Sequence, residues 1–420
     1  MYRGWKVAAV AVAMAVVAAA CGSSGKKDNG SGASSPTSAK ALSGDPVVIG
    51  TMFPVNAPGV NFPDLQYVAQ VAVKAVNDRG GIKGRPLKWV SCDDKGDPNV
   101  AQQCANTLIK EDKAVAMVSE VGLEGATLWP FLKQANIISW FNIPIWPDDG
   151  NSPLSYPSSL GIYAHQNVGT LVPSGKPYKH VTCVSGEGPF ADLICGFAKA
   201  GLAGTSNFDM VTYPQTTTNF QATAAKVVSG KPDAIVLVSA DSGTASVLQA
   251  LADAGSDAPI LLPSSSVGSR SIDVASKNNL DVRVAGAFGL DPKVFPARKQ
   301  MEADLAAYEK SVGAPPNYDK VSDNAMSMYF GITSLADILN KIDTISTDAI
   351  QAYVSKNPIR TGVTAPLDWS KSGPVAKAPR VVNVYGTPEK VQGGKLSSTG
   401  SVFQSSFPGV TPINVADAIK

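Results

Sequence analysis

Apolar and amphipathic stretches alternate along the chain from residue 46 onwards. Short apolar runs rich in valine and isoleucine are typical of buried parallel strands, and they occupy 47–52, 87–92, 115–121, 137–141, 180–185, 208–213, 234–239, 260–263 and 282–288. Amphipathic stretches predict helices, several of which end at a glycine, at 64–79, 99–110, 189–200, 219–229 and 244–254. This alternation predicts an α/β fold with parallel central sheets.

The series of strands is too long for one sheet of ordinary size, so we expect two lobes. A segment with two prolines and two glycines at 163–179 divides the series into similar halves. A helical stretch at 323–341 and a strand-like run at 380–385 come too late to belong simply to the second half. We therefore predict lobe 1 at 46–165, lobe 2 at 166–290, and a segment at 291–420 that crosses back and completes both. Lobes joined by several crossing strands describe a hinged clamshell.

The N-terminus has the pattern of an exported lipoprotein. Arg3 and Lys6 precede an apolar run at 7–20 that is shorter than the ~20 residues of a membrane-spanning helix, so 1–20 is predicted to be a signal peptide. Ala18-Ala19-Ala20-Cys21-Gly22 resembles a bacterial lipobox, although the usual leucine is absent three residues before Cys21. We expect Cys21 to be lipidated on the outer side of the cytoplasmic membrane, with a flexible tether at 21–45. Ordinary cleavage beside an incidental cysteine is the alternative.

The four remaining cysteines form two equally spaced pairs. Cys92 and Cys104, and likewise Cys183 and Cys195, are twelve residues apart, each pair joining the end of an apolar run to the helical stretch that follows. An even number of cysteines in an oxidising compartment predicts two disulfides. A zinc site is disfavoured because the chain has no Cys-x-x-Cys motif and only two histidines. We expect no metal and no cofactor.

Charge and motif content disfavour two further classes of function. The chain has 36 basic and 34 acidic residues, and loss of Arg3 and Lys6 with the signal peptide leaves 34 of each. A neutral chain without a basic cluster has no electrostatic reason to bind nucleic acid. A secreted hydrolase would need His165 or His180 beside a Gly-x-Ser-x-Gly elbow, and no such elbow occurs. We therefore expect that the chain is not an enzyme.

Three motifs together resemble one family. They are Val48-Ile49-Gly50-Thr51, then Asn77-x-x-Gly80-Gly81-Ile82-x-Gly84, then Asp93-Asp94-x-x-Asp97-Pro98. In this order and at this spacing they resemble the branched-chain amino-acid binding proteins of ABC importers, which are type I periplasmic binding proteins, over about residues 46–385. Without the family, the glycines could form a phosphate loop and the aspartates paired acids or a calcium loop. Turn formation and capping of the next helix by Asp97 are the simpler interpretations.

The resemblance implies two Rossmann-like lobes joined by three connecting strands, with a small molecule captured between them. It also implies delivery of that molecule to the permease subunits of an ABC importer, and we expect the chain to act as a monomer. A sensor of the same fold, coupled to a membrane signalling partner, is the alternative function.

The candidate ligand-binding residues lie where strands end, because doubly wound sheets bind ligands at the carboxyl ends of their strands. They are Asn56, Phe62, Ser119, Glu120, Val121, Trp140, Phe141, Asn142, Phe190, Asp241 and Ser265. The resemblance places the family's carboxylate-binding stretch on Ser119-Glu120-Val121 and its ammonium-binding glutamate on Ser265. Glu120 would repel a carboxylate and Ser265 cannot neutralise an ammonium, so we expect leucine, isoleucine and valine to bind poorly. Either Glu120 or Asp241 then takes the ammonium, or the ligand has none.

Several aromatic residues add a second expectation about the ligand. Trp129, Trp140, Phe141 and Trp146 lie close together in the sequence and could line the ligand cleft. Packing inside the lobe is the alternative for the same four side chains.

Overall fold

A computed structural model describes residues 41–57, 61–62, 64–122, 124–173, 176–188, 191–239, 241–313 and 322–419. The predicted signal peptide, Cys21, most of the predicted tether and Phe190 lie outside these ranges. Within them, no helix is both long and apolar enough to cross a membrane.

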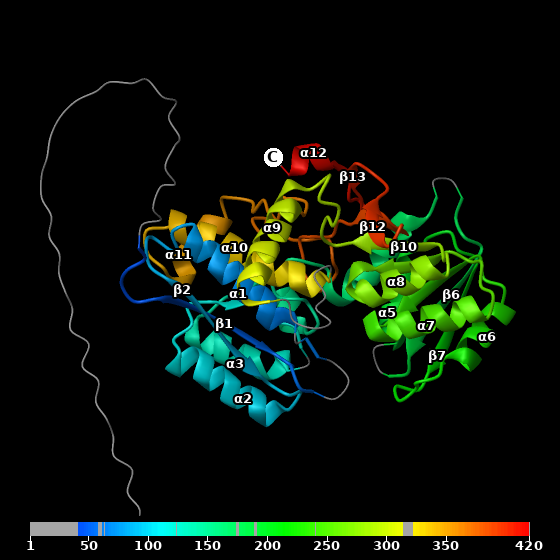
Figure 1. Cartoon of the computed structure of the whole chain (residues 1–420), viewed down its shortest axis with the longest axis horizontal. Helices are drawn as coiled ribbons and strands as arrows, with labels where there is room; N and C mark the ends of the chain where they lie inside the picture. The colour runs from blue at the N-terminus through cyan, green and yellow to red at the C-terminus, as the bar shows by residue number, and fades with distance from the viewer. Residues whose placement is uncertain are drawn as a thin grey trace, which may run out of the picture. The chain divides into compact units, whose positions relative to one another are not determined.

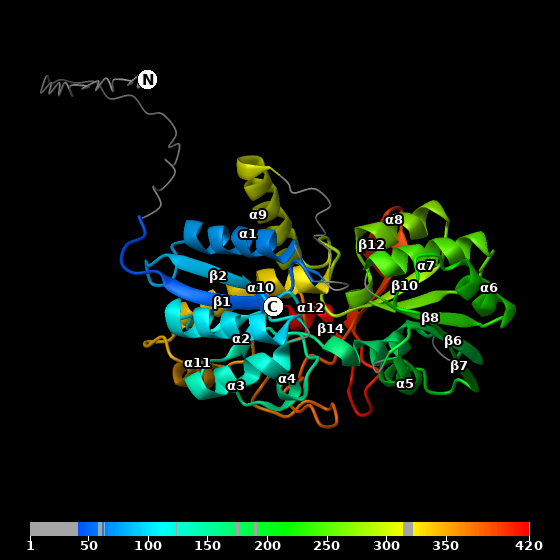
Figure 2. The same ribbon diagram turned by 90° about the horizontal axis from the view of Figure 1, so that it is seen from below.

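The first sheet is parallel throughout and forms the centre of lobe 1. Its strands run in the order β2-β1-β3-β4-β5. Helix α1 lies on one side of β1 and β2, and α2 and α3 lie on the other (Figure 2). The strands are β1 Val47–Phe53, β2 Leu87–Asp93, β3 Met117–Val118, β4 Ser139–Trp140 and β5 Ser155–Tyr156. The helices around this sheet are α1 Asp64–Asp78, α2 Pro98–Asn106, η1 Thr107–Glu111, α3 Gly125–Ala135, α4 Pro147–Asn151, α9 Pro296–Val312, α10 Asp323–Lys341 and α11 Thr347–Val354.

The second sheet is mixed and forms the centre of lobe 2 (Figure 1). Its order is β12-β11-β10-β9-β8-β6-β7, with β11 and β12 antiparallel at one edge. Helices α6, α7 and α8 cover one face and α5 the other (Figure 2). The strands are β6 His180–Gly186, β7 Asn207–Tyr213, β8 Ala234–Val238, β9 Ile260–Pro263, β10 Val282–Gly286, β11 Thr387–Gln392 and β12 Lys395–Ser398. The other elements are η2 Gly161–Leu171, α5 Ala191–Gly201, α6 Gln221–Ser229, α7 Asp241–Asp253, η3 Ser264–Ser266, α8 Ser269–Lys277, β13 Val402–Phe403, β14 Ile413–Asn414 and α12 Val415–Ala418.

The predicted α/β fold with two lobes and parallel sheets is therefore confirmed, while two of the predicted strands are only two residues long. The runs at 115–121 and 137–141 contract to β3 and β4 because the next residues leave the extended conformation. Ser119 and Phe141 have φ values of 55° and 59°. Residues other than glycine rarely adopt this left-handed backbone conformation. Each strand thus ends at a sharp change in chain direction at the carboxyl edge of the sheet.

The motifs of the sequence form turns and a helix cap. Gly80, Gly81 and Gly84 all have positive φ, and Ile82 and Arg85 exchange backbone hydrogen bonds of 2.9 Å around the turn that follows α1. The side chain of Asp97 accepts hydrogen bonds from the N–H groups of the first turn of α2, the nearer at 2.7 Å. The glycines therefore make a turn, and Asp97 caps the helix as predicted.

Both predicted disulfides are confirmed. Cys92 in β2 is bonded to Cys104 in α2, with their Cα atoms 5.4 Å apart. Cys183 in β6 is bonded to Cys195 in α5, with Cα atoms 6.0 Å apart. Each disulfide joins a strand to the helix that follows it along the chain, from the edge strand β2 in lobe 1 and from the interior strand β6 in lobe 2.

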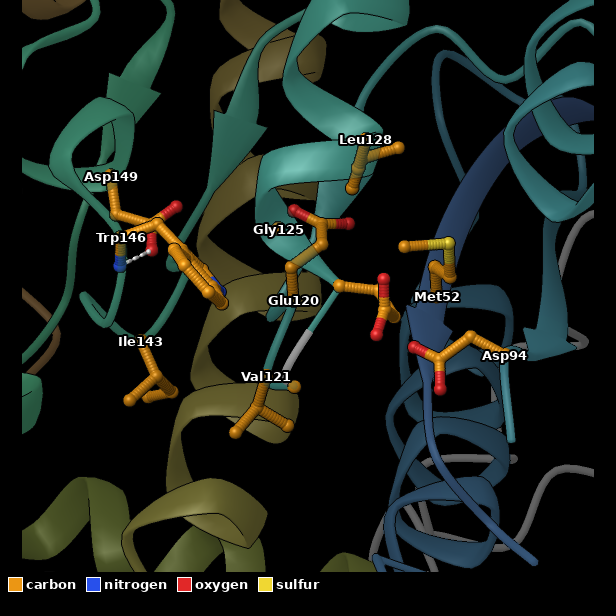
Figure 3. A pocket seen from close by; sticks show the side chains of 11 residues that line it. Met52, Asp94, Glu120, Val121, Gly125, Leu128, Ile143, Trp146 and Asp149 are labelled. Atoms are coloured by element: carbon orange, nitrogen blue, oxygen red, sulfur yellow. Dashed lines mark hydrogen bonds between the residues drawn. The ribbon is translucent and has the colours of Figure 1, made fainter. Parts of the chain in front are cut away.

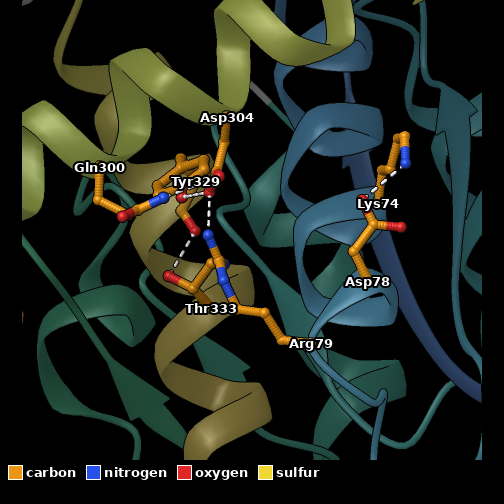
Figure 4. Close-up of polar contacts among 7 residues, drawn as sticks. All are labelled: Lys74, Asp78, Arg79, Gln300, Asp304, Tyr329 and Thr333. Atoms are coloured by element: carbon orange, nitrogen blue, oxygen red, sulfur yellow. Dashed lines mark hydrogen bonds and ion pairs between the residues drawn. The ribbon is translucent and has the colours of Figure 1, made fainter. Parts of the chain in front are cut away.

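Two helices from the C-terminal part of the chain pack beside α1. Arg79, at the end of α1, pairs with Asp304 of α9, which also accepts a hydrogen bond from the hydroxyl of Tyr329 in α10 (Figure 4). Gln300 donates to the same carboxylate over 3.0 Å. Burial, with a contribution from the Asp304 carboxylate, raises the pKa of Tyr329. This cluster joins α1 to two helices, α9 and α10, that begin more than 200 residues later in the chain.

Three segments pass between the lobes, and one side chain joins them. They are the stretch after β5, the stretch after β10, and residues 380–386. The side-chain amide of Asn383 donates to the carbonyl of Ser158 at 2.7 Å and to that of Ala287 at 3.4 Å. The prediction of a strand at 380–385 was wrong, because the backbone of this segment does not pair with a neighbouring strand. Its apolar side chains Val381 and Val384 are buried in a cluster with Leu160 and Ala164, from the stretch after β5.

Candidate functional site

A small pocket lies in lobe 1 at the carboxyl ends of β1, β3 and β4. The pocket is small, with a cavity volume of about 20 Å³. Figure 3 shows carboxylate and apolar side chains around it. We call it the acidic pocket, and it is lined by Met52, Asp94, Glu120, Val121, Gly122, Glu124, Gly125, Leu128, Ile143, Trp146 and Asp149.

Glu120 follows β3 and has one oxygen without a partner. Its Oε2 accepts a hydrogen bond from the hydroxyl of Ser139 in β4, and its backbone carbonyl accepts one from Ile143 at 3.0 Å. Its Oε1 is closed off from solvent and has no hydrogen-bond partner, although the residue as a whole is only partly buried. Burial, with a smaller contribution from the charge of Asp149, raises the pKa of Glu120 to about 8. The free carboxyl group therefore carries a proton at neutral pH.

Asp149 has a structural task beside Glu120. Its carboxylate accepts hydrogen bonds from the indole of Trp129 at 2.7 Å and from the backbone N–H groups of Ile145 and Trp146 at 2.9 and 2.7 Å. Burial raises the pKa of Asp149, and these donors oppose the rise. The side chain fixes the loop between β4 and α4, and with it the position of the Trp146 ring.

Asp93 and Asp94 have different surroundings although they are adjacent. Asp93 accepts from the backbone of Val55 at 2.8 Å and from the side chain of Asn56 at 2.9 Å. Burial alone would raise the pKa of Asp93, but these donors lower it below its usual value. Asp94 accepts from Gly96 at 2.8 Å, and burial followed by the charges of Glu124 and Asp93 raises its pKa. Asp93 thus holds the loop after β1, whereas Asp94 belongs to the acidic pocket.

Ser119 lies in a buried cluster of hydroxyl groups. Its Oγ donates to Ser327 of α10 at 3.1 Å, Ser158 lies 3.0 Å from the same hydroxyl, and Ser327 donates to the carbonyl of Phe141 at 2.6 Å. All three serines are fully buried. The hydroxyl of Ser119 is therefore engaged in joining the ends of β3 and β4 to α10.

Trp140 and Phe141 lie in the core of lobe 1. Both are fully buried. The Trp140 ring is 5.3 Å from the rings of Phe141 and Trp369 and 5.4 Å from that of Tyr156, and its indole N–H donates to Ser334 at 3.1 Å. Trp129 is buried as well, whereas the ring of Trp146 lines the acidic pocket. Of the four aromatic residues considered from the sequence, Trp146 thus lines the acidic pocket and the other three are buried.

The other candidate residues are spread over several environments. Val121 lines the acidic pocket. Asn142 is buried, accepts from Ser155 at 3.2 Å, and has an amide nitrogen without a partner. Phe62 packs partly buried against the core, and Ser265 is exposed in η3. Phe190 and the side chain of Asp241 lie outside what the structure describes. The structure thus brings Glu120 and Val121 together in one pocket. Asn56 does not line this pocket, but it donates to Asp93, the residue before the pocket residue Asp94.

A second pair of buried acids was not predicted from the sequence. Asp323, at the start of α10, accepts from Ser264 at 2.9 Å, and burial raises its pKa to about 7. Glu389 in β11 accepts from Leu290 at 3.2 Å, and burial, with Asp323 contributing, raises its pKa to about 8. Only the return of the C-terminal segment places these carboxyl groups beside the ends of β9 and β10, so no local pattern could indicate them.

The histidines and the acids lack the arrangement of a hydrolase or a metal centre. His165 is buried with both ring nitrogens unpartnered, and burial lowers its pKa to about 4. His180 pairs with Asp209 at 2.8 Å. In the described part of the chain, no serine hydroxyl is bonded to either ring, and no group of three or more His, Cys, Asp or Glu residues is placed to hold a metal ion.

Comparison with known proteins places these features in a family context. Residues 46–384 match the model of the periplasmic binding protein family. A substrate-binding protein of a chemotactic signal transduction system from Halobacterium salinarum is 37% identical over 87 residues, which are 20% of this chain and 21% of that protein. An amino acid binding protein from Pseudomonas aeruginosa is 37% identical over 73 residues, 17% of this chain and 20% of its own. The aligned segments thus span about a fifth of the curated relatives.

Solved structures show the same fold at low sequence identity. An extracellular ligand-binding receptor from Verminephrobacter eiseniae has a TM-score of 0.68 at 14% identity, with 84% of this chain and all of that chain covered.

Proposed function

Because the chain belongs to the periplasmic binding protein family, we propose that it is an extracytoplasmic solute-binding protein that captures a small molecule and delivers it to an ABC importer. The observation that carries the proposal is the presence of two α/β sheets, joined by three crossings, with a pocket at the carboxyl edge of the first. Ligands of open α/β sheets bind at this edge. We expect binding without turnover.

A thermal-shift screen tests the binding function. Ligand that binds only the folded state raises the melting temperature, since ligand at about 100 times Kd stabilises a protein by about 2.7 kcal/mol. The screen uses the chain from residue 41 onwards and libraries of amines, amino acids, sugars, carboxylates and amides. A reproducible shift followed by recovery of the unchanged compound supports capture, and chemical conversion of the compound would contradict it.

We predict that leucine, isoleucine and valine bind weakly. Their carboxylate would meet the carboxyl groups of the acidic pocket, and Ser265, exposed and uncharged, gives their ammonium no partner. Each defect costs on the order of a few kcal/mol, and micromolar affinity is only about 8 kcal/mol in total. Calorimetry on ligand-stripped protein should detect no micromolar binding. Micromolar leucine binding by the wild type would contradict the prediction, and binding that also survives Asp241→Ala and Glu120→Ala would show that the residues carried over from the family are the wrong ones.

We predict that Cys21 anchors the protein to the membrane. The Cys21→Ser variant should move from the membrane fraction to the soluble fraction, because the acyl chains are then absent, and its melting temperature should not change. Fractionation followed by immunoblotting measures the distribution, and Cys92→Ser is the control for loss of a different cysteine. A Cys21→Ser variant that stays with the membrane would show that another segment anchors the chain.

A sensor function is the second candidate, because one relative belongs to a chemotactic signal transduction system. The two functions differ in what deletion of the gene abolishes. Loss of uptake of the radiolabelled ligand identified by the screen supports transport, whereas unchanged uptake with loss of the behavioural response to that ligand supports sensing.

A further inference from the structure

A chain of buried hydrogen bonds runs through the junction between the lobes and includes all three crossing segments. The hydroxyl of Ser264, in η3 at the end of β9, accepts from the backbone N–H of Ala287 at 2.9 Å and donates to the carboxyl group of Asp323 at 2.9 Å. Asn383 donates to the carbonyls of both Ala287 and Ser158. Because η3 belongs to lobe 2 and Asp323 begins α10 of lobe 1, the bond between Ser264 and Asp323 links the lobes directly.

The same chain of bonds returns to α10 one turn further along. The hydroxyl of Ser158 lies 3.0 Å from that of Ser327. Ser327 follows Asp323 by four residues in α10, a spacing that places both side chains on one face of the helix. The bonds therefore close into a ring, in which the start of α10 is held to lobe 2 through Asp323 and to the crossing segments through Ser327.

Asp323 is the member of this ring that carries an ionisable carboxyl group. The residue is 4% exposed, and its Oδ1 has no hydrogen-bond partner among the described residues. Glu389 of β11, close enough for the two charges to interact, is 1% exposed and has an Oε2 that also lacks a described partner. We call these two acids the junction pair. A buried carboxylate is costly unless donors or a cation satisfy it, so these surroundings favour the protonated forms.

Two features favour an ionised Asp323, and burial outweighs them. Ser264 donates to its carboxyl group, and Asp323 lies in the first turn of α10, where the helix dipole stabilises a negative charge. Burial nevertheless raises the pKa of Asp323 to about 7. Burial, with the charge of Asp323 contributing, raises the pKa of Glu389 to about 8. The junction pair therefore loses its protons near neutral pH and not in the usual acidic range.

The charged groups on the surrounding elements do not neutralise the junction pair. Asp291, after β10, adds a further negative charge that acts on Glu389. Arg298 of α9 contacts Met326 one turn along α10, but its guanidinium pairs with Glu302 at 3.1 Å. The three residues of η3 are serines and bring no charge. In the described part of the chain, neither acid of the junction pair forms an ion pair.

We propose that the junction pair is a proton-sensitive link between the lobes, in which the bond between Ser264 and Asp323 holds the lobes together while the pair is uncharged, and ionisation of the pair releases that bond and lets the lobes separate further. An ionised carboxylate gains its full hydration only in water, and Asp323 reaches water when the start of α10 moves away from η3. The link acts on the lobes themselves, so it operates whatever the ligand is.

Proton linkage gives the direction and the range of the pH dependence. In the separated form the carboxyl groups face water and have pKa values of about 4. The joined form, with pKa values of about 7 and about 8, binds more protons between these limits. Its population relative to the separated form therefore falls as the pH rises, by at most about tenfold per pH unit for each group that becomes exposed. The fall is complete above about pH 8.

The first experiment measures the separation of the lobes without any ligand. Spin labels are attached at exposed positions through Gln134→Cys in α3 of lobe 1 and Ala225→Cys in α6 of lobe 2, in the Cys21→Ser protein (Figure 2). Double electron–electron resonance gives the distribution of distances between the labels from about pH 5 to about pH 9. The mean distance should increase up to about pH 8 and then level off. An unchanged distribution, in protein that circular dichroism shows to be folded, would overturn the proposal.

The second experiment removes the charges from the link. Asp323→Asn keeps the shape of the side chain but cannot ionise, so the distance should respond less to pH, and in Asp323→Asn/Glu389→Gln it should not respond. Asp337→Asn is the matched control, because it removes an acid from the other end of α10, and its response should equal that of the wild type. A response of wild-type size in Asp323→Asn/Glu389→Gln would overturn the proposal.

Ser264→Ala carries the test if the variants of Asp323 do not fold. It removes the hydroxyl that joins the lobes and leaves both acids in place, so the mean distance should already be increased at about pH 5. A distribution equal to that of the wild type at this pH would overturn the proposal. These experiments use no ligand, so their failure leaves the solute-binding function intact, and a failed ligand screen leaves the link intact.

Discussion

Replacement of Trp140 by alanine should lower the free energy of unfolding by about 3–5 kcal/mol, the cost of removing a large aromatic side chain from a core. Trp140 is fully buried, stacks on Phe141 and contacts Tyr156 and Trp369. The variant would leave a cavity among three rings and remove the indole that donates to Ser334. Chemical denaturation followed by tryptophan-independent far-UV circular dichroism measures the change.

Trp140→Phe is the matched control for this prediction. It keeps a ring in the site but removes the hydrogen bond to Ser334, so its loss should be well below that of Trp140→Ala. A Trp140→Ala variant that unfolds at the wild-type denaturant concentration but no longer binds ligand would show that this ring belongs to the ligand site and not to the core.

Removal of the disulfide between Cys183 and Cys195 should cost about 3 kcal/mol of stability, because the bond closes a short loop in the unfolded chain. Both cysteines are buried in the core of lobe 2 and join β6 to α5. The double variant Cys183→Ala/Cys195→Ala should therefore unfold at a clearly lower urea concentration. Equilibrium unfolding of oxidised wild type and variant measures the difference.

The disulfide of lobe 1 offers an internal comparison. Cys92→Ala/Cys104→Ala opens a loop of the same length, with a separation of twelve residues in both cases, so the entropic part of the loss should be the same. Free thiols detected at Cys183 and Cys195 in the exported wild-type protein would contradict the prediction, because the bond to be removed would not exist.

The parts of the fold with strong local patterns were predicted closely. β1 begins at Val47 and α1 begins at Asp64 as expected, because an apolar run and an amphipathic period are read from neighbouring residues alone. The strand expected at 380–385 is a crossing segment, because its apolar side chains are buried against the stretch after β5 and its backbone forms no ladder. A short apolar run does not reveal whether its residues form a strand or are simply buried by distant parts of the chain.

The candidate site was predictable only in part, for a related reason. Glu120 was singled out because it replaces a small polar residue of the family pattern, and it does line a pocket. Its neighbours Asp94 and Asp149 come from β2 and α4 through loops that no periodicity describes. The position of the aromatic residues at the end of β4, in the cleft or in the core, could not be predicted. The left-handed conformation of Phe141 changes the direction of the chain there, and no sequence pattern indicates it.

Asn383 has a kinematic consequence for any rotation of one lobe against the other. In a rigid rotation each atom moves in proportion to its distance from the axis. A hydrogen bond between two of the segments that pass between the lobes therefore survives only if it lies close to that axis. The amide of Asn383 holds the carbonyls of Ser158 and Ala287 at the same time. If those bonds persist, the axis passes near this side chain, and the lever arm of every ligand-contacting group is its distance from Asn383.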